Sequence, residues 1–162
     1  MEIHKGSGPK THQSFVLGSH PPLTEDLRRQ LRKVLENQEY RDKWGNILPI
    51  SVDEETERGW KYRVTFNAPV FPGEPIEIIE KRTWPWWGRK EGDEWVRSHY
   101  TRPSANTLAT IVVQLPERTT FVKLEPEPLW TMNLNGRETT GWRRFLTPEG
   151  ILGPMVRYRL GG

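Results

Sequence analysis

The alternation of apolar and polar side chains is clearest over residues 60–67, where Trp60, Tyr62, Val64 and Phe66 alternate with polar residues. A period of two residues is typical of a strand with one buried and one solvated face. Further short segments of strand character follow along the chain, at 76–81, 95–100, 107–115, 119–125, 129–134, 142–146 and 155–160. The pattern predicts a mainly β chain.

Two dipeptides predict tight turns between these strands. Proline presets φ at the first turn position and glycine accepts a positive φ at the second, so we expect Pro72-Gly73 to reverse the chain. Asn-Gly is the strongest signal for a two-residue hairpin, and Asn135-Gly136 should join 129–134 to a returning strand. Short strands joined in this way predict an antiparallel β-sandwich or barrel.

One helix is predicted, over residues 24–39. Its apolar residues recur at the spacing of a single helical face and are Leu27, Leu31, Val34 and Leu35. Thr24 is a suitable N-cap, and the first turn carries acidic residues where the helix dipole favours them. We interpret the arginines on the opposite side as a solvated face, with a surface for an anionic partner as the alternative.

Residues 1–22 show neither the helical nor the strand period, and their one apolar cluster is the triplet Phe15–Leu17. We expect a flexible arm there, and the alternative is that the triplet docks as a short added strand. The eight-residue spacing of His4, His12 and His20 matches no familiar metal signature. The predicted organisation is this arm followed by one domain over 23–162, with the helix at 24–39 and the sandwich at 45–162.

Composition supports this class. With 14 glycines, 14 prolines and 28% charged residues, the chain suits a loop-rich β protein. The formal charge is only +3, so an overall basic field is a weak argument for nucleic acid. The absence of cysteine excludes disulfides, thiolate metal sites and thiol catalysis.

Location is predicted from what the chain lacks. No apolar run approaches the roughly 20 residues that a membrane-spanning helix needs, and the first residues lack the apolar block of a signal peptide. A chain free of cysteine also fits a reducing compartment. We expect a soluble, cytoplasmic protein with no membrane contact.

No catalytic motif is recognisable. The fragment Gly6–Thr11 has the glycines and lysine of a phosphate loop, but Pro9 removes a backbone donor and no strand precedes it. The acidic run at 53–57 is expected in a solvated loop, and His99 is expected to be structural. We therefore expect no enzyme, no cofactor and no metal.

The tryptophan-rich segment WPWWG at 84–88 is the main candidate for recognition. Such aromatics either fill a core or stay exposed as rigid anchors, and three of them within four residues cannot all point the same way. We predict a non-catalytic module for another protein, with contacts from Trp84, Trp86, Trp87, Arg89 and Trp95. Binding of single-stranded nucleic acid by stacking on these rings is an alternative.

Residues 60–160 resemble the immunoglobulin-like β modules that accompany bacterial regulatory or defence proteins. The resemblance is carried by Pro69–Pro75 (PVFPGEP), by the tryptophan-rich segment, and by Arg102-Pro103 ahead of a strand. It implies an immunoglobulin-like sandwich and, by analogy only, a role in protein interaction.

The last eight residues, Met155–Gly162, resemble the tail of ubiquitin-like modifiers, in which a strand of alternating apolar and basic residues leads into Gly-Gly. This resemblance implies conjugation through the final glycine, with Arg159, Leu160, Gly161 and Gly162 as the tail. Glycine suits a narrow enzyme channel because it has no side chain. The predicted helix precedes the strong strands, however, which departs from the element order of that family. An ordinary frayed end is the alternative.

Overall fold

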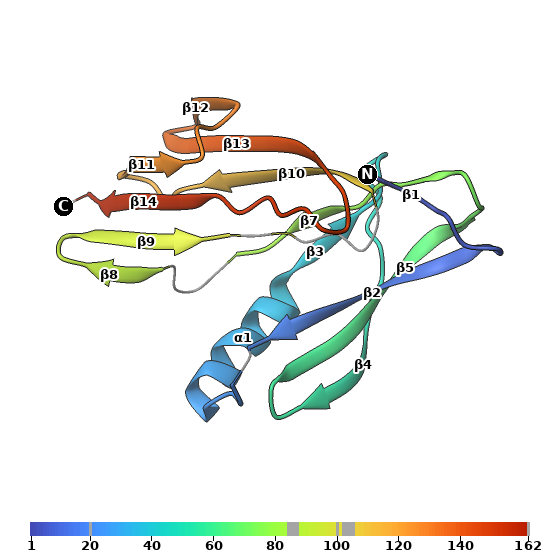
Figure 1. The fold of residues 1–162 in the computed structure, drawn as a ribbon. Coiled ribbons are helices and arrows are strands. Elements are labelled where there is room, and N and C mark those ends of the chain that lie inside the picture. The colour runs from blue at the N-terminus through green and yellow to red at the C-terminus, as the bar shows by residue number, and fades with distance from the viewer. Residues whose placement is uncertain (20, 84–87, 100, 102–105, 162) are drawn as a thin grey trace. The chain divides into compact units, whose positions relative to one another are not determined.

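The computed structural model describes residues 1–19, 21–83, 88–99, 101 and 106–161 (Figure 1). The fold is mainly β, with 56% strand and 9% helix, which confirms the class that the alternation predicts. The chain divides into two compact units, Met1–Pro85 and Trp86–Gly162. This division falls inside the domain predicted over 23–162, and each unit is described by itself.

The first unit contains an antiparallel sheet in the order β2-β5-β4. Its strands are β2 (Lys10–Gly18), β5 (Gly59–Val70) and β4 (Ile50–Thr56). In β5, Trp60, Tyr62 and Val64 are buried and the residues between them are exposed, as the alternation predicts. The central strand of this sheet is thus the segment with the strongest periodicity.

Strand β2 lies where the sequence indicates a flexible arm. The structure differs from that expectation over Lys10–Gly18, which pairs along β5 from Val70 to Gly59. The ring of Phe15 lies 5.1 Å from that of Tyr40 and 5.7 Å from that of Tyr62. Pairing to a distant strand and ring contacts order a segment whose own residues show no period, and the added strand considered for Phe15–Leu17 is part of it.

Helix α1 (Glu25–Asn37) runs beside β2 (Figure 1). Thr24 caps it as predicted, because its Oγ1 accepts a hydrogen bond of 3.3 Å from the backbone N of Leu27. Leu31, Val34 and Leu35 are buried, so the apolar face packs inward. Among the described residues, no helix has the length and apolar character that crossing a bilayer requires.

Residues 53–56 of the acidic run lie in β4, not in the loop that the sequence indicates. Its carboxylates meet cations of the same unit: Asp53 pairs with Arg63 at 2.8 Å and Glu54 with Lys61 at 2.6 Å. Opposite charges on neighbouring strands stabilise a sheet, so an acidic strand is tolerated here.

Short strands complete the first unit. β1 (Glu2–Ile3) pairs with β6 (Pro75–Ile76), and β3 (Glu39–Arg41) pairs with β7 (Ile79–Lys81). The strand predicted over 76–81 therefore occurs as two short ones. The turn before them has the expected form, since Gly73 has φ 88° and Glu74 N donates to Phe71 O at 3.0 Å.

The second unit contains a sheet in the order β11-β14-β9-β8. Its strands are β11 (Thr119–Glu125), β14 (Met155–Leu160), β9 (Glu94–Ser98) and β8 (Arg89–Glu91). A second set of neighbours runs β12-β13-β10, from Trp130–Leu134, Arg137–Leu146 and Thr107–Gln114. Both sets contribute to one buried cluster, which includes Val113, Trp142, Leu146, Val156 and Tyr158.

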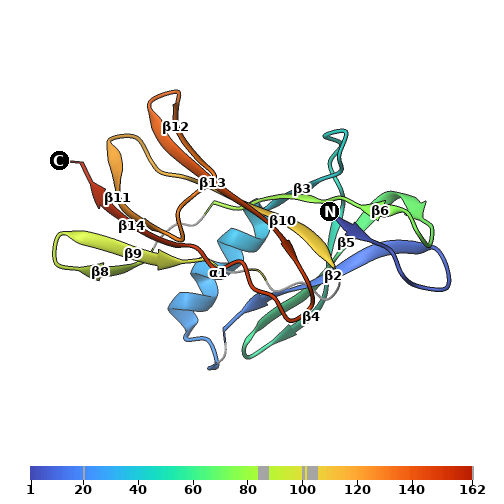
Figure 2. The same cartoon turned by 45° about the horizontal axis from the view of Figure 1, so that its top comes forward.

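The Asn135-Gly136 hairpin is confirmed. Both residues have positive φ, 52° and 78°, and Leu134 pairs with Arg137 across a two-residue loop. These angles are those of a type I′ turn, which matches the twist of the paired strands. The hairpin of β12 and β13 is orange in Figure 2.

Candidate functional site

One candidate surface of the second unit is a face of strands β10, β13 and β12, which we call the outer face. Alternate residues of each strand share a face, and three side-chain contacts identify the set. Arg143 Nε donates to Thr110 Oγ1 at 3.2 Å, Gln114 Nε2 donates to Thr139 Oγ1 at 3.2 Å, and the Trp130 ring covers Gly141. The outer face includes Val112, Trp130, Met132, Arg143 and Phe145, together with the polar Thr110 and Gln114.

Gly141 determines how Trp130 lies. A Cβ added at position 141 would stand 2.4 Å from Cε2 of the Trp130 ring, closer than any side chain permits. Trp130, Gly141 and Val112 are directly paired across the three strands, so the ring lies on bare backbone beside Val112. The glycine therefore fixes an aromatic ring against the sheet at the free β12 edge.

Three large apolar side chains of the outer face are exposed. Phe145 is 64% exposed, Val112 54% and Met132 46%. Soluble monomers rarely expose a contiguous apolar patch of this kind, and such patches mark interaction sites. Small-molecule sites are concave, so a sheet face of this kind fits an extended partner surface better.

A cation without a counter-ion lies within this apolar surface. Arg143 follows Gly141 and precedes Phe145 on the same face of β13, and no described residue offers it a carboxylate. Two other arginines of this unit do have carboxylate partners: Arg157 pairs with Glu91 and Glu94, and Arg159 pairs with Asp93 and Glu94. The guanidinium of Arg143 is thus available to a carboxylate from outside.

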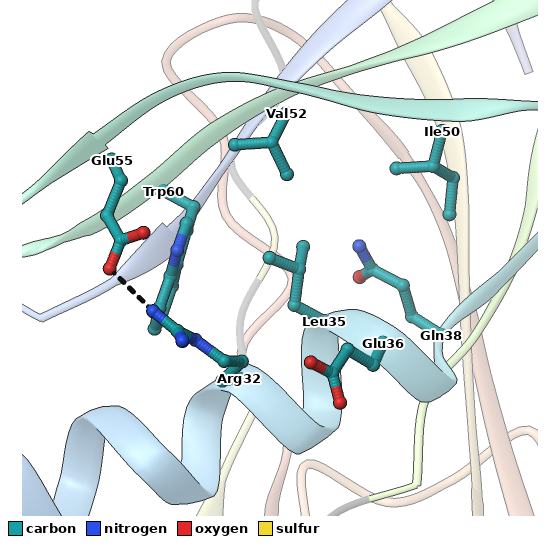
Figure 3. A pocket seen from close by; sticks show the side chains of 8 residues that line it. All are labelled: Arg32, Leu35, Glu36, Gln38, Ile50, Val52, Glu55 and Trp60. Carbon is teal, nitrogen blue, oxygen red and sulfur yellow. Dashed lines mark hydrogen bonds and ion pairs between the residues drawn. The ribbon is translucent and has the colours of Figure 1, made fainter.

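A second feature is a hollow in the first unit, between helix α1 and strand β4 (Figure 3). Side chains from the helix and from β4 face each other across it, over a volume of about 540 Å³. Its lining is apolar in the middle and polar at both ends, and consists of Arg32, Leu35, Glu36, Gln38, Ile50, Val52, Glu55 and Trp60.

One end of the hollow is closed by Arg32, Glu55 and the buried Trp60. Arg28 and Arg32 each donate to the same oxygen of Glu55 at 2.9 Å, and their guanidinium carbons lie 5.4 and 5.9 Å from the Trp60 ring centroid. Desolvation tends to raise the pKa of Glu55, but hydrogen bonds from Trp60 and Arg28 outweigh it and lower the pKa. One carboxylate therefore neutralises only one of the two cations.

The other end is formed by Gln38, which is 6% exposed. Its Oε1 accepts a hydrogen bond of 3.1 Å from Arg82 Nε, which fixes the orientation of the amide. Its Nε2 is buried, and no described residue accepts a hydrogen bond from it. A buried donor left without a partner costs roughly 1–3 kcal/mol, so an acceptor placed beside this amide would be favourable.

Arg82 is held by two tyrosines behind Gln38. Its Nη2 donates to Tyr62 Oη at 2.6 Å, and the hydroxyls of Tyr40 and Tyr62 lie 2.7 Å apart. Burial raises the pKa of both phenols, so both stay protonated at neutral pH. The cluster positions Gln38 and supplies no acid or base for catalysis.

His99 has a strongly shifted pKa. Burial, with repulsion from Arg97, lowers its pKa to about 4, so the ring is neutral at pH 7. No set of three or more histidines and carboxylates among the described residues is arranged to hold a metal ion. The structural role that the sequence indicates for His99 stays a prediction.

Of the five residues predicted to bind a partner, the structure describes Arg89 and Trp95. Arg89 is exposed on β8 and pairs with Glu91, whereas Trp95 on β9 is partly buried and packs against the core cluster of the second unit. Trp84, Trp86 and Trp87 lie outside the described residues. Trp95 therefore contributes to packing, and the tryptophan-rich contact stays a prediction.

Two residues of the predicted conjugation tail are part of a sheet. Arg159 and Leu160 belong to β14, and Leu160 pairs with Thr119 of β11. Gly161 passes so close to Arg118 that an added Cβ would stand 2.0 Å from its backbone O. Gly162 lies outside the described residues.

The chain was also compared with known proteins. No protein-family model matches it, and no curated protein or solved structure does either. The function is therefore argued from the geometry of the two surfaces.

Proposed function

We propose that the chain is a non-catalytic module that binds another protein through the outer face of its second unit. The observation that carries this proposal is Arg143, a cation without a carboxylate among the described residues, set between the Trp130–Val112 row and the exposed Phe145. Tryptophan and arginine are enriched among the few residues that dominate binding energy at interfaces.

The chemistry of the surface indicates the chemistry of the partner. An apolar face with one uncompensated guanidinium fits a segment that carries large apolar residues and one aspartate or glutamate. Arginine binds a carboxylate with two parallel hydrogen bonds, which adds orientation to the apolar contact. The charge pair should also speed association at low salt.

We further infer that the second unit packs as a β-sandwich. In support, Val113 and Trp142 come from one set of strands and Val156 and Tyr158 from the other, and all belong to one cluster. In a sandwich the opposite side of each sheet faces solvent, which is where the outer face lies. This architecture would present Arg143 on a rigid scaffold.

The experiment uses two neighbouring charge reversals. Arg143 and Arg144 are both exposed, and they project to opposite faces of β13. Arg143→Glu and Arg144→Glu therefore change the net charge identically, but only the first alters the outer face. Each tagged full chain is used to capture proteins from the cells of origin, and the retained protein is then purified and titrated directly.

We expect one protein to be retained by the wild type and by Arg144→Glu, and to be lost with Arg143→Glu. Phe145→Ser should weaken the same complex. All variants should keep the wild-type melting temperature, because the substituted side chains are exposed. Equal retention by both charge-reversal variants would contradict the proposal, and so would capture that depends on neither Arg143 nor Phe145.

A further inference from the structure

Strand β4 has an unpaired backbone edge beside the hollow. Within the described sheet order, β4 pairs only with β5. Thr65 N donates to Pro49 O at 2.9 Å, so Ile50 and Val64 form a non-hydrogen-bonded pair of the antiparallel ladder. The N–H and C=O groups of Ile50 and of Val52 consequently point away from β5, and no described residue bonds them.

The side chains of these two residues line the hollow. Ile50 and Val52 extend from β4 toward Leu35 of the helix, as Figure 3 shows. A strand added beside β4 would continue the sheet, and its residues opposite Ile50 and Val52 would share their face. Those residues would therefore project over the hollow between the sheet and α1.

We propose that an extended peptide segment of a partner adds to the edge of β4 and inserts one large apolar side chain into the hollow. Addition of a strand to a sheet edge is a recurring mode of peptide recognition, in which the backbone supplies affinity and a side-chain pocket supplies specificity. Here the backbone groups of Ile50 and Val52 would supply the affinity, and the hollow beside Leu35 would supply the specificity.

The hollow also defines the inserted side chain. Leu35, Ile50 and Val52 give it an apolar wall, while Gln38 Nε2 is a donor without an acceptor among the described residues. A side chain that is mainly apolar but carries an acceptor near its end, such as tyrosine or methionine, suits this arrangement best. A strictly charged side chain does not, because burying it needs a counter-charge.

The structure limits the added strand to one part of the edge. A β-bulge interrupts the ladder between Val52 and Glu54, and the acidic side chains beyond it are paired with Arg63, Lys61 and the helix arginines. Bulges and charges protect edge strands against unwanted pairing. The segment from Ile50 to Val52 carries neither feature, so it is the stretch open to a peptide.

This site is independent of the outer face. All of its residues lie in the first unit, whereas Arg143 and Phe145 lie in the second. Loss of one function by substitution should therefore leave the other in place.

The test begins with a selection from a phage-displayed library of short linear peptides against the full wild-type chain. An enriched peptide is synthesised with a fluorophore, and its affinity is measured by anisotropy for the wild type, Val52→Ala, Val52→Pro and Arg143→Glu. The Val52 pair is matched, because both variants shorten the side chain but only proline removes the outward N–H. Proline is tolerated on an edge strand where its nitrogen faces solvent.

We expect enriched peptides to share one large apolar residue at a fixed position. Val52→Pro should bind about tenfold more weakly than Val52→Ala, as the loss of one backbone hydrogen bond implies, and Arg143→Glu should bind as the wild type does. Failure of the selection to enrich any peptide, or equal affinities for the two Val52 variants, would overturn the proposal.

A second measurement does not depend on the folding of a variant. Amide hydrogen exchange of the wild-type chain is followed with and without the selected peptide. The amides of Ile50 and Val52 should become protected on binding, since a partner carbonyl would accept from each. Protection confined to residues outside β4 and α1 would contradict strand addition at this edge.

Discussion

At the scale of single residues, Gly141 is the position where a small change should have a large and local effect. A Cβ there would overlap the Trp130 ring, at 2.4 Å from Cε2. The ring must either leave the sheet or push β12 away, and over-packing of this kind costs about 1–3 kcal/mol.

We therefore predict that Gly141→Ala destabilises the chain by about 1–3 kcal/mol in urea denaturation. Gly8→Ala is the control, because an added Cβ at Gly8 meets nothing within 4 Å, and its effect should stay within about 0.5 kcal/mol. Adding Trp130→Ala to the Gly141 variant should recover part of the loss. A neutral Gly141→Ala would mean that Trp130 does not lie on β13.

His99 gives a prediction for pH. Its folded-state pKa, about 4, lies below the unfolded value of about 6.5, so protonation favours the unfolded chain. The contribution of the neutral His99 ring to the free energy of unfolding is complete above the unfolded-state pKa. It is lost as the pH falls from that pKa toward the folded-state pKa of about 4. The loss should reach no more than about 3 kcal/mol near pH 4, discounted for partial exposure.

Urea denaturation of the wild type and of His99→Gln between pH 7 and pH 4 tests this. The difference in unfolding free energy between them should shrink as the pH falls, because the substituted side chain does not titrate. Carboxylates such as Glu91, whose pKa is lowered by hydrogen bonds from Arg89 and Arg157, contribute equally to both chains. A difference independent of pH would contradict the shifted pKa.

At the scale of elements, the cap of α1 is the clearest local determinant. Thr24 Oγ1 satisfies a backbone donor that the helix cannot satisfy itself. Thr24→Ala should cost about 1 kcal/mol of unfolding free energy in urea, while Thr24→Asn, which can also cap, should stay close to the wild type. Equal losses for both substitutions would mean that the loss of unfolding free energy does not come from the capping hydrogen bond.

The elements that could be predicted from sequence are those with local signals. Helix α1, strand β5 and the Asn135-Gly136 hairpin are encoded by periodicity, capping and turn chemistry within their own residues. Strand β2 could not be predicted from its own residues, because it is ordered by pairing with β5, more than forty residues away. The acidic part of β4 is a strand for the same reason, since its cations come from β5 and α1.

The two candidate surfaces could not be predicted from the sequence for a related reason. Trp130 and Val112 become neighbours only through the register of β12, β13 and β10, with Gly141 between them. The one available signal was TTGWRRF at 139–145, where outward Gly141, Arg143 and Phe145 alternate with the buried Trp142. Likewise, the hollow needs Gln38 and Val52, which belong to different elements.

At the scale of the whole molecule, the two proposed binding surfaces lie on separate units. The outer face of the second unit and the hollow of the first are both lined by apolar residues beside arginines. Two independent surfaces on one short chain would allow it to join two partners without catalysing a reaction.

The tryptophan-rich segment provides a further test at this scale. If Trp86 and Trp87 serve recognition, replacing both by alanine should abolish partner capture and leave the melting temperature nearly unchanged. A marked fall in melting temperature would instead assign these rings to packing.

Binding of a partner through Arg143 of the outer face is tested most directly by the affinity of the purified partner for the two charge-reversal variants. The affinity is measured by calorimetry at low and at physiological salt. We expect Arg143→Glu to weaken binding at least about tenfold, most strongly at low salt. Arg144→Glu should bind the partner nearly as the wild type does. Equal affinities for Arg143→Glu and Arg144→Glu would contradict it.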